Sequence, residues 1–440
     1  MFPLFDLSLH LNGFQMKKAK AEIRKIVTFT EKEHAEFVAY KKQEIVNYHL
    51  ENNPFYSNLF GMNPFTRWED VPVLNKKNLQ IPLQERISKE YSLKQCYVNK
   101  TSGSSGTPFI FAKDKYCHAL TWASNMYRFS WYDIDFNTSY QARFYGIPMD
   151  FIGNKKERLK DFLSHRFRFS IFDLSDVVLE GFLNHFKTKK FDYINGYTSS
   201  IVLFAKFLQQ KNIVLKTICP SLKVCMVTSE MLFEADKILL EKQFGIPIVN
   251  EYGASELDLI AFQSRSVGTE GEWQVNSETL FVEILDENNQ VLPYGQEGRI
   301  VITSLFNKAH PFIRYDIGDI GLLDEKSTLQ KPILKKLVGR TNDVAVLPSG
   351  KKAPGLTFYY VTKSIIEDDG KVKEFLIKQT KIDSFDIEYV SENELNWEQI
   401  QKIEQAIALY LEPNLHFKFI RRNTLKRSNR GKLKQFTSLL

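Results

Sequence analysis

A regular alternation of two kinds of segment between residues 98 and 256 most restricts the fold of this 440-residue chain. Short segments rich in β-branched and aromatic residues, such as FDYINGY at 191–197 and SLKVCMVTSE at 221–230, are predicted strands. The longer segments between them, such as TSSIVLFAKFLQQKN at 198–212, carry apolar residues at helical spacing. This alternation is typical of an α/β domain with parallel strands, in which ligands bind at the carboxyl ends of the strands. The polar segments TSGSSGT, GYTSS, VTSE and EYGASE all follow predicted strands.

The flanking segments indicate further subdomains. Residues 15–60 are predicted to be helical, with ENNPFYSNLFG as the break, and short strands from about 273 to 323 indicate a small β subdomain. The segment at 335–355 marks a boundary, after which a hairpin, helix, two strands, helix and strand predict a small α+β domain. We therefore expect a large α/β N-terminal domain of several subdomains over 1–339 and a small α+β C-terminal domain over 340–440.

Composition excludes several classes of protein. With 43% hydrophobic and 25% charged residues, the chain is typical of a globular protein, and its net charge of +7 suits an anionic ligand or an acidic partner. It has no run of 18 apolar residues and no recognisable secretion signal, so we expect no transmembrane segment and a cytoplasmic location. The four cysteines have neither zinc-ribbon nor disulfide-framework spacing. The basic segment at 421–434 has no aromatic-interleaved motif, so no nucleic-acid partner is expected.

The loop TSGSSGT at 101–107 consists only of glycine and hydroxyl residues. Such a composition fits a flexible linker. It also fits a phosphate cradle, because glycines let backbone N–H groups converge and hydroxyls add small donors. The apolar segment PFIFA follows at once, and no Walker-type Gly-Lys-Ser/Thr is present. Composition alone leaves both interpretations open.

The order of five motifs decides between them. TSGSSGTP, EYGASE, RYDIGD, GRTND and a C-terminal RGK occur in this order over most of the chain. Together they resemble the adenylate-forming superfamily of acyl- and aryl-CoA ligases, most of all the phenylacetate–CoA ligase branch and, within it, the CapK-like proteins. The resemblance implies ATP-dependent activation of a carboxylic acid to an acyl-adenylate, release of pyrophosphate, and transfer to a thiol. It also implies that the small C-terminal domain is mobile.

The same resemblance assigns roles to individual residues. The loop becomes the cradle of the β- and γ-phosphates, and Asp319 becomes the acceptor for the ribose hydroxyls, with Asp316 less favoured. The residues implied in ATP binding are Thr101, Ser102, Gly103, Ser104, Ser105, Gly106, Thr107, Ser229, Glu230, Asn250, Glu251, Tyr252, Gly253, Ser255, Asp319 and Arg340.

The remaining roles concern the metal, the acid and the chemistry. Glu256 is the implied Mg²⁺ ligand, and Lys432 is the implied catalytic lysine, with Lys426 and Lys434 as alternatives. The implied acyl pocket comprises Gly196, Tyr197 and Ala254, and the hinge at 340–344 includes Asn342 and Asp343. The chain departs from the family pattern at Thr107, where many relatives have lysine, and at Asn342, where aspartate or lysine is usual.

The substrate and the acceptor stay open at this point. The 35 phenylalanines and the segment RFYGIPMDF favour an aryl or other apolar acid. The cofactors implied are ATP and Mg²⁺, with coenzyme A, a carrier-protein phosphopantetheine arm or a sugar as the acyl acceptor. An acyl carrier protein and a second copy of the chain are the possible partners. A nucleotide-binding scaffold or sensor without ligase activity is the alternative from another class.

Overall fold

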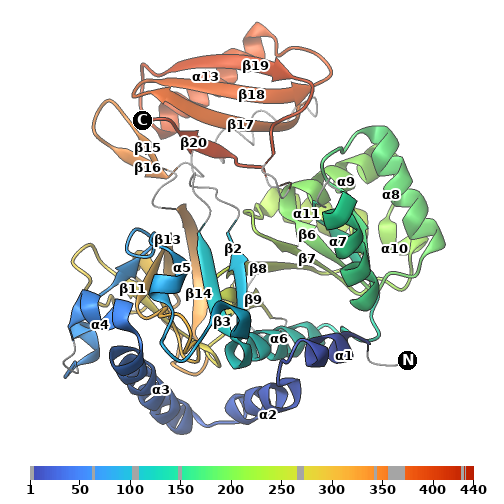
Figure 1. Cartoon of the computed structure of the whole chain (residues 1–440). Helices are drawn as coiled ribbons and strands as arrows, with labels where there is room; N and C mark the ends of the chain where they lie inside the picture. Colours follow the sequence, from blue (N-terminus) through green and yellow to red (C-terminus); the bar gives the residue numbers. More distant parts are fainter. Residues whose placement is uncertain are drawn as a thin grey trace. The chain divides into compact units, whose positions relative to one another are not determined.

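The computed structural model describes residues 4–61, 65–101, 109–146, 151–264, 272–340, 344–354, 372–427, 431 and 433–440 (Figure 1). The chain divides into two compact units. One comprises Met1–Ile317 and Leu322–Lys336, and the other comprises Gly318–Gly321 and Leu337–Leu440. The domain limits and the hinge predicted from the sequence stay predictions.

A large sheet forms the centre of the first unit. The strands follow the order β11-β12-β13-β14-β10-β9-β8-β7-β6-β4-β5 in the described part of the chain. Their bounds are β4 Gln141–Phe144, β5 Arg166–Phe169, β6 Tyr193–Tyr197, β7 Val224–Thr228, β8 Ile248–Ala254, β9 Asp258–Gln263, β10 Trp273–Val275, β11 Leu280–Leu285, β12 Glu297–Ser304, β13 Tyr315–Leu323 and β14 Ile333–Arg340. Strands β5, β4, β6, β7 and β8 pair in parallel, as the alternation predicts.

Helices cover both faces of the parallel strands. The bounds are α6 Lys115–Ser130, α7 Phe151–Leu163, α8 Asp176–Thr188, α9 Thr198–Gln210, α10 Leu215–Ile218 and α11 Glu234–Phe244. One face packs Phe144, Phe169 and Ile194 against α8, α9 and α11, and the other packs Tyr193 and Met226 against Phe129 of α6. Many of the phenylalanines therefore fill this core: Phe144, Phe169, Phe182, Phe186 and Phe204 form a contiguous set of ring contacts.

The strands after Trp273 continue the same sheet. Antiparallel pairs join β8 to β9, β9 to β10, and β10 to β14, and β11 pairs with β12 in the same way. Strand β1 (Leu74–Asn75) pairs in parallel with β13. The predicted β subdomain is thus hydrogen-bonded to the α/β part through β9 and β10.

The region predicted to be helical forms α2 (Met16–Val27) and α3 (Glu31–Asn52), and a further helix, α1 (Leu4–Leu11), precedes it. The segment predicted as a break ends α3 at Asn52 and also starts a further helix, α4 (Pro54–Phe60). The Asn53 side chain accepts a hydrogen bond from the Tyr56 N–H, and Pro54 occupies the first turn. Both features initiate a helix as readily as they end one. A short helix, α5 (Leu83–Arg86), precedes the hairpin of β2 (Cys96–Lys100) and β3 (Ile110–Asp114).

The second unit contains a small sheet in the order β19-β18-β17-β20. Its elements are the hairpin β15 (Val344–Val346) and β16 (Lys352–Pro354), then β17 (Val372–Lys381), β18 (Ser384–Ser391), α13 (Trp397–Tyr410), β19 (His416–Arg422) and β20 (Phe436–Ser438). Strands β17 and β18, helix α13 and strand β19 follow the predicted order of two strands, helix and strand, whereas the helix predicted directly after the hairpin lies outside the described residues. Strand β20, which follows the basic segment at 421–434, pairs in parallel with β17.

Among the described helices, none is both long enough and apolar enough to cross a lipid bilayer.

Candidate functional site

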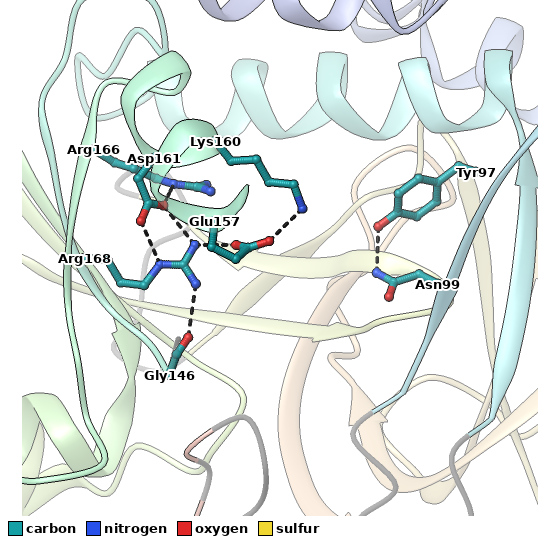
Figure 2. Close-up of polar contacts among 8 residues, drawn as sticks. All are labelled: Tyr97, Asn99, Gly146, Glu157, Lys160, Asp161, Arg166 and Arg168. Carbon is teal, nitrogen blue, oxygen red and sulfur yellow. Dashed lines mark hydrogen bonds and ion pairs between the residues drawn. The ribbon is translucent and has the colours of Figure 1, made fainter. Parts of the chain in front are cut away.

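The hairpin of β2 and β3 presents the glycine- and hydroxyl-rich loop. Two hydrogen bonds join Thr101 and Phe109 at the ends of this loop. The Thr101 N–H donates to the Phe109 carbonyl at 2.9 Å, and the Thr101 Oγ1 accepts from the Phe109 N–H at 3.0 Å. Within β2, Asn99 donates to the Tyr97 hydroxyl at 2.7 Å, as Figure 2 shows. Thr101 therefore anchors the base of the loop. The other predicted cradle residues, Ser102, Gly103, Ser104, Ser105, Gly106 and Thr107, lie outside the described residues.

The turn from β8 to β9 requires a glycine at position 253. The register slips between Tyr252 and Gly253, and a Cβ on Gly253 would lie 2.4 Å from the Asp258 carbonyl oxygen. Glu256 follows in the same turn and is buried, and its Oε1 accepts a hydrogen bond from the Tyr315 hydroxyl at 3.1 Å. The EYGASE motif thus forms a tight turn that fixes one carboxylate against β13.

Glu256 fits the role of a Mg²⁺ ligand by its chemistry. The described part of the chain contains no group of three or more His, Cys, Asp or Glu side chains suited to a metal ion. Mg²⁺, however, is commonly bound by one or two protein carboxylates together with substrate phosphates and water. A single fixed carboxylate is compatible with that mode of binding.

The ends of β6 and β7 hold the segments GYTSS and VTSE. Gly196 is required because a Cβ there would lie 2.5 Å from the Phe144 carbonyl oxygen of the adjacent strand. The Glu230 carboxylate accepts a hydrogen bond from the Ser199 N–H at 2.7 Å, in the first turn of α9. Ser229 is exposed and has a φ of 68°. The Glu230 carboxylate therefore stabilises the start of α9, where backbone donors are unsatisfied.

Strand β8 places residues predicted to bind the nucleotide beside the carboxyl end of β6 in the register of the sheet. The register aligns Tyr197 with Thr228 of β7, and Thr228 with Glu251 of β8. The Asn250 N–H donates to Gln263 Oε1 at 2.8 Å. Tyr252 is buried, and Ala254 and Ser255 are half-buried. The structure thus brings the predicted acyl-pocket residue Tyr197 and the predicted nucleotide residues of β8 to one end of the parallel strands.

Burial raises the pKa of Glu251 to about 7. Hydrogen bonds from Asn195 and Thr228 and the positive charge of Arg143 oppose this rise in pKa. Asn195 Nδ2 lies 3.3 Å from Glu251 Oε2, and Gln141 Nε2 donates to Asn195 Oδ1 at 3.4 Å. Sequence reasoning missed Gln141, Arg143 and Asn195. The available signal was the presence of polar residues inside two segments that otherwise have the composition of buried strands.

The RYDIGD motif spans the start of β13. Its arginine, Arg314, is buried, and its Nη1 donates to the carbonyl oxygens of Glu69 and Val71 at 2.9 and 2.7 Å. Asp316 forms an ion pair with Arg299 at 2.6 Å. Asp319 is buried on β13. The contacts of Arg314 and Asp316 are architectural, and the ribose role of Asp319 stays a prediction.

The remaining predicted residues belong to the region after β14. Arg340 is the last residue of β14, and its side chain is not described. The predicted hinge residues Asn342 and Asp343 and the predicted catalytic Lys432 lie outside the described residues. Gly431, immediately before Lys432, is buried and has a φ of 85°. Their roles stay predictions.

The fold is that of solved adenylate-forming ligases. The chain matches a 2-hydroxyisobutyryl-CoA ligase, in the postadenylation state in complex with R3-HIB-AMP, with a TM-score of 0.65 and 16% identity over 90% of this chain and 87% of that chain. It also matches an amide bond synthetase from Marinactinospora thermotolerans, with a TM-score of 0.53 and 13% identity over 81% of this chain and 69% of that chain.

Relatives detected by sequence indicate a more specific group within these ligases. The chain is 23% identical to Protein CapK of Staphylococcus aureus over 86% of this chain and 84% of the relative. It is 29% identical to the phenylacetate-coenzyme A ligase of Aromatoleum evansii over a shorter region, 29% of each chain. No protein-family model matches the chain. The resemblance to CapK and phenylacetate–CoA ligases predicted from the five motifs is confirmed.

Proposed function

We propose that the chain activates a carboxylic acid with ATP and transfers the acyl group to a thiol. The turn that fixes Glu256 at the end of β8, beside the aligned ends of β6 and β7, is the observation that carries the proposal. The ordered motifs and the ligases among the relatives and structural neighbours support it.

Two steps describe the reaction. A carboxylate oxygen of the acid attacks the α-phosphorus of ATP, forming the acyl–phosphate bond, while the bond from the α-phosphorus to the bridging oxygen breaks and pyrophosphate leaves. A thiolate then attacks the acyl carbon, and AMP leaves with the electron pair of the broken C–O bond. Coenzyme A is the acceptor we propose, with a carrier-protein arm or a sugar as alternatives.

The residues take distinct parts in these steps. Thr101 anchors the loop that holds the outer phosphates, and Asp319 accepts hydrogen bonds from the ribose. Glu256 would hold Mg²⁺, which offsets phosphate charge when bound. Lys432 neutralises charge between the acid and the α-phosphate in the first step. A cytoplasmic location, a carrier-protein partner and a homodimer stay predictions.

ATP–pyrophosphate exchange over a panel of aryl, fatty and hydroxy acids tests the proposal. We expect exchange with at least one acid, and a loss of about a hundred- to thousandfold in Lys432→Ala, on the scale of removing one preorganised donor. Exchange in the lysine variant at the unmodified rate would move the catalytic role to Lys426 or Lys434. ATP binding without exchange for any acid would instead favour a nucleotide-binding scaffold.

A further inference from the structure

Strands β4 and β5 carry three arginines whose positions are aligned with polar residues. Arg143 of β4 lies opposite Arg168 of β5, and Arg166 lies opposite Gln141. Helix α7 neutralises two of these cations (Figure 2): Asp161 pairs with Arg166 at 2.5 Å and with Arg168 at 2.9 Å. Glu157, also of α7, pairs with Arg168 at 2.8 Å. The carboxylates of α7 thus form ion pairs with both Arg166 and Arg168.

Arg143 differs from its two neighbours. No ion pair or hydrogen bond joins its side chain to another residue in the described ranges, and its Nε is buried without a hydrogen-bond partner. Its guanidinium group lies over the ring of Tyr145, 4.1 Å from the centroid. A buried donor without a partner costs free energy unless a ligand or water accepts its hydrogen bond.

Glu251 supplies an acceptor close to this donor. Arg143 is near enough for its charge to oppose the rise of the Glu251 pKa, yet the two side chains form no ion pair with each other. Asn195, held by Gln141, donates to one Glu251 oxygen. A carboxylate accepts several hydrogen bonds, so Glu251 retains capacity for a further donor.

Both groups lie near Tyr197, one of the residues predicted to form the acyl pocket. The Tyr145 ring, on which Arg143 lies, contacts the ring of Tyr197 with centroids 4.5 Å apart. Glu251 lies in the same motif as Ala254, and the register places it level with Tyr197 through Thr228. The adjacent Phe144 belongs to the core packed on α8 and α9, so it is not available to line a pocket beside Arg143.

We propose that the acid activated by this chain carries a hydroxyl group that accepts a hydrogen bond from Arg143 and donates one to Glu251. The inference rests on the proposed function, since it assumes that the acid binds beside Tyr197. Arginine only donates and a carboxylate accepts, and a hydroxyl is the small group that satisfies both at once. A second carboxylate on the acid would pair with Arg143 but be repelled by Glu251. An unsubstituted aryl or alkyl acid would leave Arg143 Nε without a hydrogen-bond partner and would add no donor to Glu251.

Exchange kinetics with matched acids test this inference. The pairs are 4-hydroxyphenylacetate with phenylacetate, and 3-hydroxybutyrate and 4-hydroxybutyrate with butyrate; adipate represents a second carboxylate. A site built around a substrate hydroxyl discriminates strongly against the analogue that lacks it. We expect kcat/KM to favour a hydroxy acid over its counterpart by about a hundredfold, because the counterpart leaves a buried donor without a partner.

Three variants locate the source of the preference. Arg143→Met and Glu251→Leu should each reduce it to less than about tenfold, because each removes one partner of the hydroxyl. Arg67→Met, which removes an exposed arginine paired with Asp70, should leave it unchanged. Glu251→Ala, which also removes the acceptor, replaces Glu251→Leu if the latter fails to fold by circular dichroism.

The outcomes separate this inference from the function on which it rests. Exchange without a hydroxyl preference, or with a preference for adipate, would overturn the hydroxyl inference and leave the ligase function intact. If no acid supports exchange, saturation-transfer NMR with the same pairs reports binding directly. Hydroxy-acid binding that disappears in Arg143→Met would then support the pocket while the ligase function fails, and equal or absent binding of both acids in every pair would overturn it.

Discussion

Arg314, in the antiparallel part of the large sheet, and Arg143, in the parallel part, use their positive charge differently. In the antiparallel part, Arg314 is almost fully buried, pairs with Glu283 at 3.5 Å and donates to carbonyl oxygens of the segment before β1. In the parallel part, Arg143 and Glu251 lie near each other without pairing. A buried cation that satisfies distant backbone groups holds the architecture together. A donor and an acceptor left apart at the end of parallel strands are available to a ligand.

The largest effect is expected from removing Arg314. Arg314→Met leaves the buried Glu283 carboxylate without its cation and the Glu69 and Val71 carbonyls without a donor. Breaking a buried pair in this way costs about 3–5 kcal/mol of unfolding free energy. Urea denaturation monitored by circular dichroism measures it. Arg67→Met, which breaks the exposed pair with Asp70, is the control and should leave the unfolding free energy nearly unchanged. Equal losses in the two variants would contradict the architectural role of Arg314.

Glu251→Gln should change stability in a pH-dependent manner. The folded chain holds the Glu251 proton more tightly than the unfolded chain, because burial raises its pKa from 4.5 to about 7. The unfolding free energy of the unmodified protein therefore falls as pH rises from about 4.5 to 7. At about 1.4 kcal/mol per pKa unit, the variant should be more stable by at most about 3 kcal/mol at pH 8, and by little at pH 4. Urea titrations at both pH values measure the difference, and a pH-independent difference would show that Glu251 is not buried as a neutral acid.

Glu230→Ala should have a smaller effect, confined to the start of α9. Removing the acceptor for the Ser199 N–H costs about 1 kcal/mol, the usual value for losing a helix cap. Hydrogen exchange at the first turn of α9 should increase, while exchange in α11 should not. If ATP affinity falls strongly with no change in α9 exchange, Glu230 acts on the nucleotide rather than on the helix.

Arg143→Met should change stability least. The variant loses the contact between the guanidinium group and the Tyr145 ring. It also removes a buried donor that has no partner. It removes the repulsion between Arg143 and Arg166 as well; burial and Arg143 together lower the pKa of Arg166 to about 10. The two effects nearly cancel, so the unfolding free energy should stay within about 1 kcal/mol of the unmodified value. A loss as large as that of Arg314→Met, in the same urea assay, would place Arg143 among the architectural cations.

Local patterns predicted the parallel half of the fold. Strands β6, β7 and β8 and helices α8, α9 and α11 follow from short apolar runs, helical periodicity and turn residues, all of which act within a few positions. The pairing of β10 with β14, and of β1 with β13, joins segments far apart in the sequence. No local pattern encodes such pairing, which is why the later strands were expected as a separate subdomain.

The candidate site was only partly predictable, because some of its contacts also join residues far apart in the sequence. The family resemblance singled out Glu256, Gly196 and Gly253, whose functional roles stay predictions, and the close backbone approaches explain both glycines. Arg143 and Asn195 matter because the register of β4 and β6 places them side by side. The register of two strands cannot be predicted from a single sequence. The phenylalanine count indicated an apolar acid, but many of these rings fill the core between the sheet and α8 and α9.

The pairing of β1 with β13 has a consequence for biosynthesis. The ribosome releases residues 69–75 long before Arg314 and Tyr315, their partners some 245 positions later, have been made. The apolar side chains of α1 and α2 pack with Leu305 and Phe306, so part of their packing surface is also synthesised much later. A nascent chain of this protein therefore exposes an incomplete N-terminal core during most of its translation, which makes it a natural client for chaperones that bind near the exit tunnel.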